Sequence, residues 1–166
     1  INETYVTDEN TASEKRKVAR EKITEILNIL SGTKASDDAF YILNSGRYEF
    51  KNKGIDLFIN ALGKLNKSAE LNKEIVAVIA VPANISGIYK ELEYRREGKK
   101  PIEGHTDLPC THHIFGYEYD AVLNSLRENG LNNNSEDKVK VMFVPSYLNG
   151  NDGVFNLKYN DFLYAF

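Results

Sequence analysis

Cysteine is almost absent from the sequence, since Cys110 is the single one among 166 residues. An internal disulfide is therefore impossible, which excludes the disulfide-stapled scaffolds of small secreted proteins. The shortage favours a reducing compartment, and we expect a cytoplasmic location. At this length roughly 70% of the unfolded chain's surface becomes buried on folding, so a single core needs neither a disulfide framework nor a metal.

A charge surplus and long apolar runs are lacking as well. Lys and Arg together number 21 and Asp and Glu 24, so the net charge of −3 offers no general attraction to nucleic acid or to anionic membranes. The longest apolar run, residues 75–81, is too short to span a bilayer, and the acidic, polar N-terminus is unlike a signal peptide. We expect no nucleic-acid and no membrane partner, and any anion site must be local.

What the sequence does contain is the balance of an ordinary globular domain, with 42% hydrophobic and 27% charged residues. It begins at Ile1 without a methionine and stops at Phe166 inside an apolar-periodic stretch, which predicts a piece of a longer chain. We expect a helical lead-in over residues 1–38 and one domain, itself incomplete, over residues 39–166.

The spacing of apolar residues along the sequence predicts the secondary-structure elements. Apolar residues at helical spacing predict amphipathic helices over 11–30, 54–65 and 119–128, a weaker helix over 88–96 and the start of another at 159–166. Thr11 and Glu14 have the spacing of a capping box, and Gly130 is placed to end a helix.

Short apolar runs bounded by turn residues predict buried strands at 39–43, 74–81 and 138–144. Strands that are apolar on both faces and alternate with helices predict an α/β fold, in which a partial doubly wound, Rossmann-like parallel sheet has helices on both faces. The usual strand order would leave 39–43 with an open edge. We expect that edge to pair with a second copy, giving a homo-oligomer, or to be covered by the N-terminal helix or the C-terminal tail.

The first strand-to-helix turn, residues 45–54, is the candidate anion site, because ligands of such sheets bind beyond the carboxyl ends of the strands. Gly46 allows a sharp exit from the strand, and Gly54 is expected to open the next helix with free backbone N–H groups. Arg47 and Lys53 add positive charge, so a diphosphate fits the chemistry. The alternative is a solvated polar loop with incidental cations, since the turn is neither a Walker loop nor a GxGxxG motif.

The same stretch, SGRYEFKNKGIDLFINAL at residues 45–62, resembles the signature of the eukaryotic-type glycogen synthases, which are retaining glycosyltransferases of two-domain GT-B architecture. A second block continues the resemblance in the same order: Thr111-His112, residues 120–131 and KVKVMFVPSYL at 138–148. The resemblance covers about residues 39–166 and implies the first half of the C-terminal, nucleotide-sugar-binding domain.

The resemblance implies a part of an enzyme that transfers glucose from UDP-glucose, or a similar nucleotide-glucose, to an α-1,4-glucan with retention of configuration. It implies that Arg47 and Lys53 bind the donor's phosphates, with Gly46 and Gly54 as supporting backbone, and it implies no cofactor. The family's Glu-containing segment and N-terminal domain are not in the sequence, so we expect no catalytic residue here and no turnover by this piece without the remainder of its chain. The competing hypothesis is a non-catalytic nucleotide-binding or assembly module of the same fold.

Histidines and the cysteine gather in one segment, where His105, Cys110, His112 and His113 could suggest a metal. Paired ligand spacings are missing, so we expect no metal site and a packing or capping role for His113. His112 matches the Thr-His pair of the resemblance, but we assign it no catalytic role.

A basic cluster, Arg95, Arg96, Lys99 and Lys100, lies near Tyr89 and Tyr94 and could be read as a polymer-binding stripe. Acidic residues are equally frequent in the same span, which favours a solvated helix end and loop.

Overall fold

The structure is a computed structural model that describes residues 9–98 and 109–166. Its helices (α), 3-10 turns (η) and strands (β) are, in chain order, α1 (Glu9–Ser31), β1 (Phe40–Ser45), α2 (Ile55–Asn66), β2 (Ile75–Ala80), β3 (Ile85–Ile88), α3 (Lys90–Arg96), β4 (His112–Ile114), η2 (Tyr117–Tyr119), α4 (Ala121–Glu128), β5 (Val139–Phe143), α5 (Tyr159–Phe162) and η3 (Leu163–Ala165).

The main sheet has three parallel strands in the order β1-β2-β5, with Phe40 opposite Ile75 and Ile75 opposite Val139. Every residue of β2 and of β5 is buried. Such strands need mostly apolar side chains on both faces, which is why they read as apolar runs in the sequence, interrupted in β5 by Lys140. The predicted strands and the α/β fold class are confirmed.

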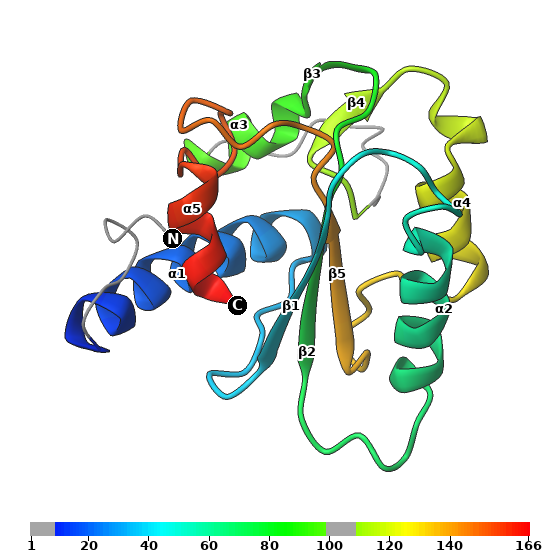
Figure 1. The fold of residues 1–166 in the computed structure, drawn as a ribbon, viewed down its shortest axis with the longest axis horizontal. Coiled ribbons are helices and arrows are strands. Elements are labelled where there is room, and N and C mark those ends of the chain that lie inside the picture. The colour runs from blue at the N-terminus through cyan, green and yellow to red at the C-terminus, as the bar shows by residue number, and fades with distance from the viewer. Residues whose placement is uncertain (1–8, 99–108) are drawn as a thin grey trace.

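Helices cover the sheet on two sides (Figure 1). On one side α2 packs against α4, and on the other α1 packs against α5 and η3. The buried face of α2 is made by Ile55, Ile59, Leu62 and Gly63, at the spacing from which the helix was predicted. The layers place all three strand ends of the sheet at one edge of the molecule.

The N-terminal helix was predicted with the wrong start. The described part of α1 already begins at Glu9, so Thr11 lies inside the helix and does not act as its N-cap. The capping-box interpretation of Thr11 and Glu14 is therefore wrong, because the spacing of two residues does not fix where the backbone turns helical.

A second, antiparallel pair of strands, β3 with β4, was not predicted. Of the weak helix predicted over 88–96, residues 90–96 form α3, whereas Ile88 belongs to β3. Next to this pair, Cys110 and Phe143 form an isolated parallel β-bridge, and the N–H of Thr111 bonds the Phe143 carbonyl at 3.0 Å. The segment before β4 thus lies alongside the carboxyl end of β5 and pairs with it.

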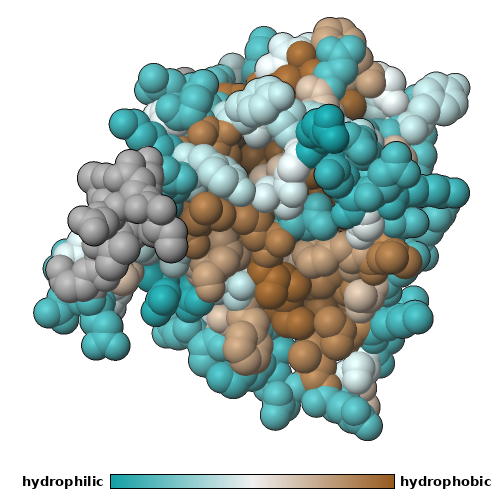
Figure 2. All heavy atoms as spheres, in the orientation of Figure 1, coloured by the Kyte–Doolittle hydropathy of each residue, from teal (hydrophilic) through white to brown (hydrophobic). Residues whose placement is uncertain are grey.

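Strand β1 has a hydrogen-bonded neighbour on one side only, as far as the described residues show. The predicted open edge is therefore present. Helix α1 contacts it through side chains: Thr24 Oγ1 lies 3.0 Å from the Tyr41 hydroxyl, and the Arg20 guanidinium lies 4.4 Å from the Tyr41 ring centroid. Apolar side chains gather in the middle of this view of the molecule, over the region of β1 (Figure 2). Pairing of this edge with a second copy stays a prediction.

Candidate functional site

A pocket of about 460 Å³ lies where β1 and β2 end, in the size range of small-molecule sites. We call it the strand-end pocket. Its lining comes from the ends of β1 and β2, the loop after β1, the segment after β5 and the first residue of α5: Ser45, Gly46, Arg47, Tyr48, Ala80, Pro82, Ser146, Tyr147, Leu148 and Tyr159. The position is the carboxyl edge predicted from the order of strands and helices.

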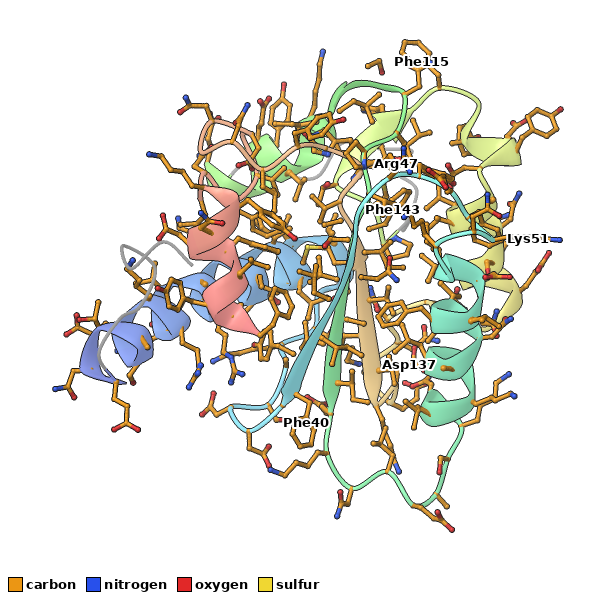
Figure 3. All side chains as sticks on the ribbon, in the orientation of Figure 1. Phe40, Arg47, Lys51, Phe115, Asp137 and Phe143 are labelled. Atoms are coloured by element: carbon orange, nitrogen blue, oxygen red, sulfur yellow. The ribbon has the colours of Figure 1, made fainter. Side chains whose placement is uncertain are left out.

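Arg47 belongs to this lining and is strongly exposed, with 78% of its side chain accessible. Figure 3 shows it at the end of the sheet where the loop leaves β1. Its Nε lies 2.9 Å from Oε1 of Glu49, which leaves the guanidinium's remaining N–H groups able to donate to an anion. An exposed ion pair of this kind contributes little stability, so exchanging it for a ligand costs little.

The backbone of the loop offers donors beside Arg47. Gly46 has a φ of 138°, which L side chains rarely adopt. In the described part of the chain, the N–H groups of Gly46, Arg47 and Tyr48 donate no hydrogen bond. Consecutive N–H groups at a sharp turn form an anion-binding concavity.

The α2 end of the loop differs from what we predicted. Gly54 is the residue before the helix, with a φ of 65°, but its N–H bonds the Lys51 carbonyl at 3.0 Å. The N–H groups of Ile55 and Asp56 both bond the Phe50 carbonyl. The N–H groups of Gly54, Ile55 and Asp56, expected to be free, are thus taken up by the turn that precedes the helix.

Lys53 lies in that turn, with its N–H bonded to the Glu49 carbonyl at 2.9 Å, and its side chain is exposed. It is not among the residues that line the strand-end pocket. Its turn neighbour Lys51 points away from the pocket, outward on the side of the molecule where α2 and α4 lie (Figure 3). The structure therefore places Arg47 at the pocket and does not bring Lys53 into it.

Tyr48 fixes the loop from within. Its hydroxyl donates to Oδ2 of Asp120 at 2.7 Å and accepts the Val122 N–H at 3.2 Å. Asp120 in turn accepts the Leu123 N–H and caps α4. Burial, together with the nearby Asp120 carboxylate, raises the pKa of Tyr48, so the phenol keeps its proton and remains the donor.

The opposite wall of the pocket comes from the C-terminal part of the chain. The Ser45 hydroxyl lies 2.9 Å from the Tyr159 hydroxyl, which joins the end of β1 to the start of α5. Tyr147 is 76% exposed beside them. Our sequence reasoning did not identify Tyr48, Tyr147 or Tyr159; the hydrogen-bond partners of Tyr48 and Tyr159 are distant in the chain.

Around the histidines, burial and packing dominate. Nδ1 of His112 lies 2.7 Å from the Thr111 hydroxyl, and burial lowers the pKa of His112 to about 4. The His113 ring packs edge-on against Tyr89 with centroids 4.0 Å apart, in agreement with a packing role. Cys110 is buried and its thiol pKa is raised to about 12, chiefly by that burial. His105 lies outside the described residues.

Within residues 9–98 and 109–166, no three metal-ligating side chains gather in one place. Of the basic cluster, Arg95 and Arg96 belong to α3, while Lys99 and Lys100 lie outside the described residues. None of the described helices combines the length and the apolar character that a membrane crossing requires.

Comparison with known proteins agrees with the resemblance seen in the sequence. The sequence model of the glycogen synthase family matches residues 17–92 and 102–165. Similar proteins include glycogen [starch] synthase isoform 1 of Saccharomyces cerevisiae, 27% identical, and glycogen [starch] synthase of Caenorhabditis elegans, 28% identical. The liver glycogen [starch] synthase of Mus musculus is 24% identical. These matches cover 76% of this chain, and it spans about a quarter of the length of each relative, 26%, 27% and 25% respectively.

Proposed function

Because the chain belongs to the glycogen synthase family, we propose that its strand-end pocket binds the diphosphate of a nucleotide-glucose donor. In the full-length protein the glucose would pass from UDP-glucose, or a similar donor, to an α-1,4-glucan with retention of configuration. The observation that carries the proposal is the place of Arg47, which lies in a pocket at the carboxyl edge beside N–H groups that have no partner among the described residues.

The chemistry explains why a cation belongs there. As the glycosidic bond to the donor breaks, the nucleoside diphosphate leaves with additional negative charge. A guanidinium that meets this charge stabilises the transition state more than the ground state, and so it accelerates the transfer as well as holding the donor. Its planar array of N–H groups can form bidentate hydrogen bonds with two phosphate oxygens.

Other lining groups suit the rest of a nucleotide-sugar. The hydroxyls of Ser45 and Tyr159 can bond ribose or sugar hydroxyls, and the exposed ring of Tyr147 offers a face on which a base can stack. Lys53 is proposed as the second phosphate contact, made by its long side chain from the turn before α2 once the donor is bound. The reaction as proposed needs no cofactor and no metal.

The proposed partners are the donor, the glucan and the remainder of the protein's own chain, and the proposed location is the cytoplasm. The segment contributes donor binding, and turnover belongs to the full-length protein. Comparison of glucosyl transfer by the full-length protein with that of the 166-residue chain tests this division.

Calorimetric titration of the chain with UDP tests the donor site. Loss of the charge-assisted bonds of Arg47 is worth about 1.5–3 kcal/mol, so Arg47→Ala weakens UDP binding by about 10- to 100-fold. Lys53→Ala weakens it by about tenfold, the effect of one point charge on a phosphate. Lys51→Ala is the matched control, since this lysine belongs to the same turn and points away from the pocket.

Equal losses in the Lys51 and Arg47 variants would show a diffuse charge effect and would overturn the assignment of the pocket. Uridine without phosphates supplies a second control, because its binding should not respond to Arg47→Ala. UDP binding by a full-length protein that transfers no glucose to glycogen would establish the competing function, a nucleotide-binding module without catalysis.

A further inference from the structure

A second pocket, of about 640 Å³, lies beside the strand-end pocket. Tyr48 and Pro82 line both, so they form a common wall between the two. On its far side the second pocket is bounded by the loop that joins β4 to α4, which carries Phe115, Tyr119 and Asp120. It is named here the loop pocket. Any ligand in it lies next to a ligand in the strand-end pocket.

Two aromatic rings border the loop pocket and are turned largely to solvent. Phe115 is 62% exposed and Tyr119 is 86% exposed. Figure 3 shows Phe115 at the end of the molecule, reaching out beyond the β3–β4 pair. Large aromatic side chains usually bury their surface, and two of them exposed on one pocket indicate a surface that contacts a ligand.

The segment that carries the rings is held in place by its own backbone. The Phe115 N–H bonds the Asn84 carbonyl at 3.0 Å, and the Tyr119 N–H bonds the Gly116 carbonyl at 2.9 Å. Asp120, directly after Tyr119, is bonded to the Tyr48 hydroxyl. The backbone behind the rings is therefore ordered before a ligand arrives, which reduces the entropy lost on binding.

The polar groups of the loop pocket suit hydroxyls and not anions. Its lining contains no lysine or arginine among the described residues, and Asp120 brings negative charge. Asn84 is exposed and offers an amide that can both donate and accept. A phosphate-bearing polymer is therefore disfavoured, whereas a neutral ligand with hydroxyl groups and apolar faces is favoured.

From these observations, and resting on the proposed function, we infer that the loop pocket binds a segment of the α-1,4-glucan chain through Phe115 and Tyr119. A pyranose ring presents C–H groups on its faces and hydroxyls around its rim. The C–H faces pack on the electron-rich faces of the aromatic rings, while the rim hydroxyls reach polar groups such as the Asn84 amide. The common wall at Tyr48 and Pro82 then sets the glucan beside the donor pocket.

The test is titration of the 166-residue chain with maltoheptaose, with cellohexaose as the β-linked comparison. Phe115→Ala and Tyr119→Ala are each expected to weaken maltoheptaose binding by about tenfold, the equivalent of about 1.4 kcal/mol of lost ring contact. Tyr119→Phe keeps the ring and is expected to keep the affinity. Phe40→Ala is the matched control, because Phe40 is 57% exposed at the opposite end of the sheet (Figure 3).

UDP titration of the same variants separates the two proposals. If Phe115→Ala lowers the affinity for maltoheptaose and leaves the affinity for UDP unchanged, the result supports the loop pocket as a distinct site. Maltoheptaose binding that is indifferent to both ring substitutions, or no stronger than cellohexaose binding, overturns the inference even if UDP binds as proposed. Loss of UDP binding alone, with ring-dependent glucan binding retained, would instead overturn the donor site and leave the glucan site standing. Circular dichroism confirms that each variant is folded.

Discussion

Removing one hydroxyl, by Tyr48→Phe, tests whether the loop after β1, residues 46–54, is held by its bond to the N-terminal end of α4. In the structure that hydroxyl donates to Asp120 at 2.7 Å and accepts the Val122 N–H at 3.2 Å. The ring itself stays packed, edge-on against Phe143 with centroids 6.3 Å apart. Phenylalanine retains this packing, so the substitution removes the two hydrogen bonds and little else.

The size of the effect follows from the charge of the acceptor. A hydrogen bond to an ionised group contributes about 1.5–3 kcal/mol, and the Val122 N–H loses a partner that water at this half-buried position can partly replace. We therefore expect a loss of about 2 kcal/mol in the free energy of unfolding. For a chain of this size each kcal/mol lowers Tm by about 2–4 °C, so the expected shift is about 4–8 °C.

Thermal unfolding followed by circular dichroism measures the shift, with Tyr119→Phe as the control. That hydroxyl belongs to a ring that is 86% exposed, and its loss should stay within about 0.5 kcal/mol. A double-mutant cycle with Asp120→Asn isolates the pair, because the amide oxygen can still cap α4 through Leu123. If Tyr48→Phe unfolds like the unsubstituted protein, or if the two substitutions are additive within about 0.5 kcal/mol, the loop is not held in this way.

Two further predictions concern other parts of the fold. His112 takes up a proton near its ordinary pKa in the unfolded chain but only near pH 4 in the folded protein, so the free energy of unfolding falls by up to about 3 kcal/mol as the pH drops between these values. Urea unfolding at pH 7.5 and 4.5 should show a smaller difference in unfolding free energy for His112→Asn than for the unsubstituted protein. Equal differences in the two proteins would contradict this prediction. In Gly63→Ala, the new Cβ would lie 2.8 Å from Cβ of Asn129, so despite the better helix propensity we expect a loss of about 1–3 kcal/mol by urea unfolding. Adding Asn129→Gly should recover part of that loss, and a Gly63→Ala variant as stable as the parent would show that the contact between α2 and α4 yields easily.

The parallel sheet could be predicted from the sequence because burial leaves a simple pattern. Strand β2 is buried at every position and is apolar without interruption, and β5 is buried at every position with Lys140 as its one polar residue. The pair β3 and β4 could not be predicted in this way. Its strands have four and three residues, contain Ser86, Gly87, His112 and His113, and pair across a long intervening stretch. Such strands owe their conformation to their partner, and local periodicity carries no sign of it.

The residues of the candidate site show the same difference between what local sequence predicts and what distant partners determine. Arg47 could be placed because it follows directly on a predicted strand, and the carboxyl end of a parallel strand fixes where such a residue lies. Tyr48 and Tyr159 could not, because their partners Asp120 and Ser45 are 72 and 114 residues away in the sequence. The loop N–H groups were assigned to the wrong residues for a related reason. No pattern in the sequence predicted the turn over 50–54, and the carbonyl groups of this turn accept the hydrogen bonds of the N–H groups at the start of α2.

The contacts of Asp120 give the two proposed sites a common structural basis. One carboxylate oxygen caps α4 through the Leu123 N–H, the other holds the Tyr48 hydroxyl, and the residue lies beside Tyr119 on the loop pocket. Tyr48 in turn adjoins Arg47 on the strand-end pocket. The loop after β1, residues 46–54, and the loop between β4 and α4, residues 115–120, are therefore held at the same helix end, so that their relative position is set by a short chain of hydrogen bonds. Glucosyl transfer needs the donor's sugar and the end of the acceptor at a fixed separation. If the two proposed sites bind these substrates in the full-length protein, a rigid link between them favours the reaction by reducing the freedom lost on the way to the transition state.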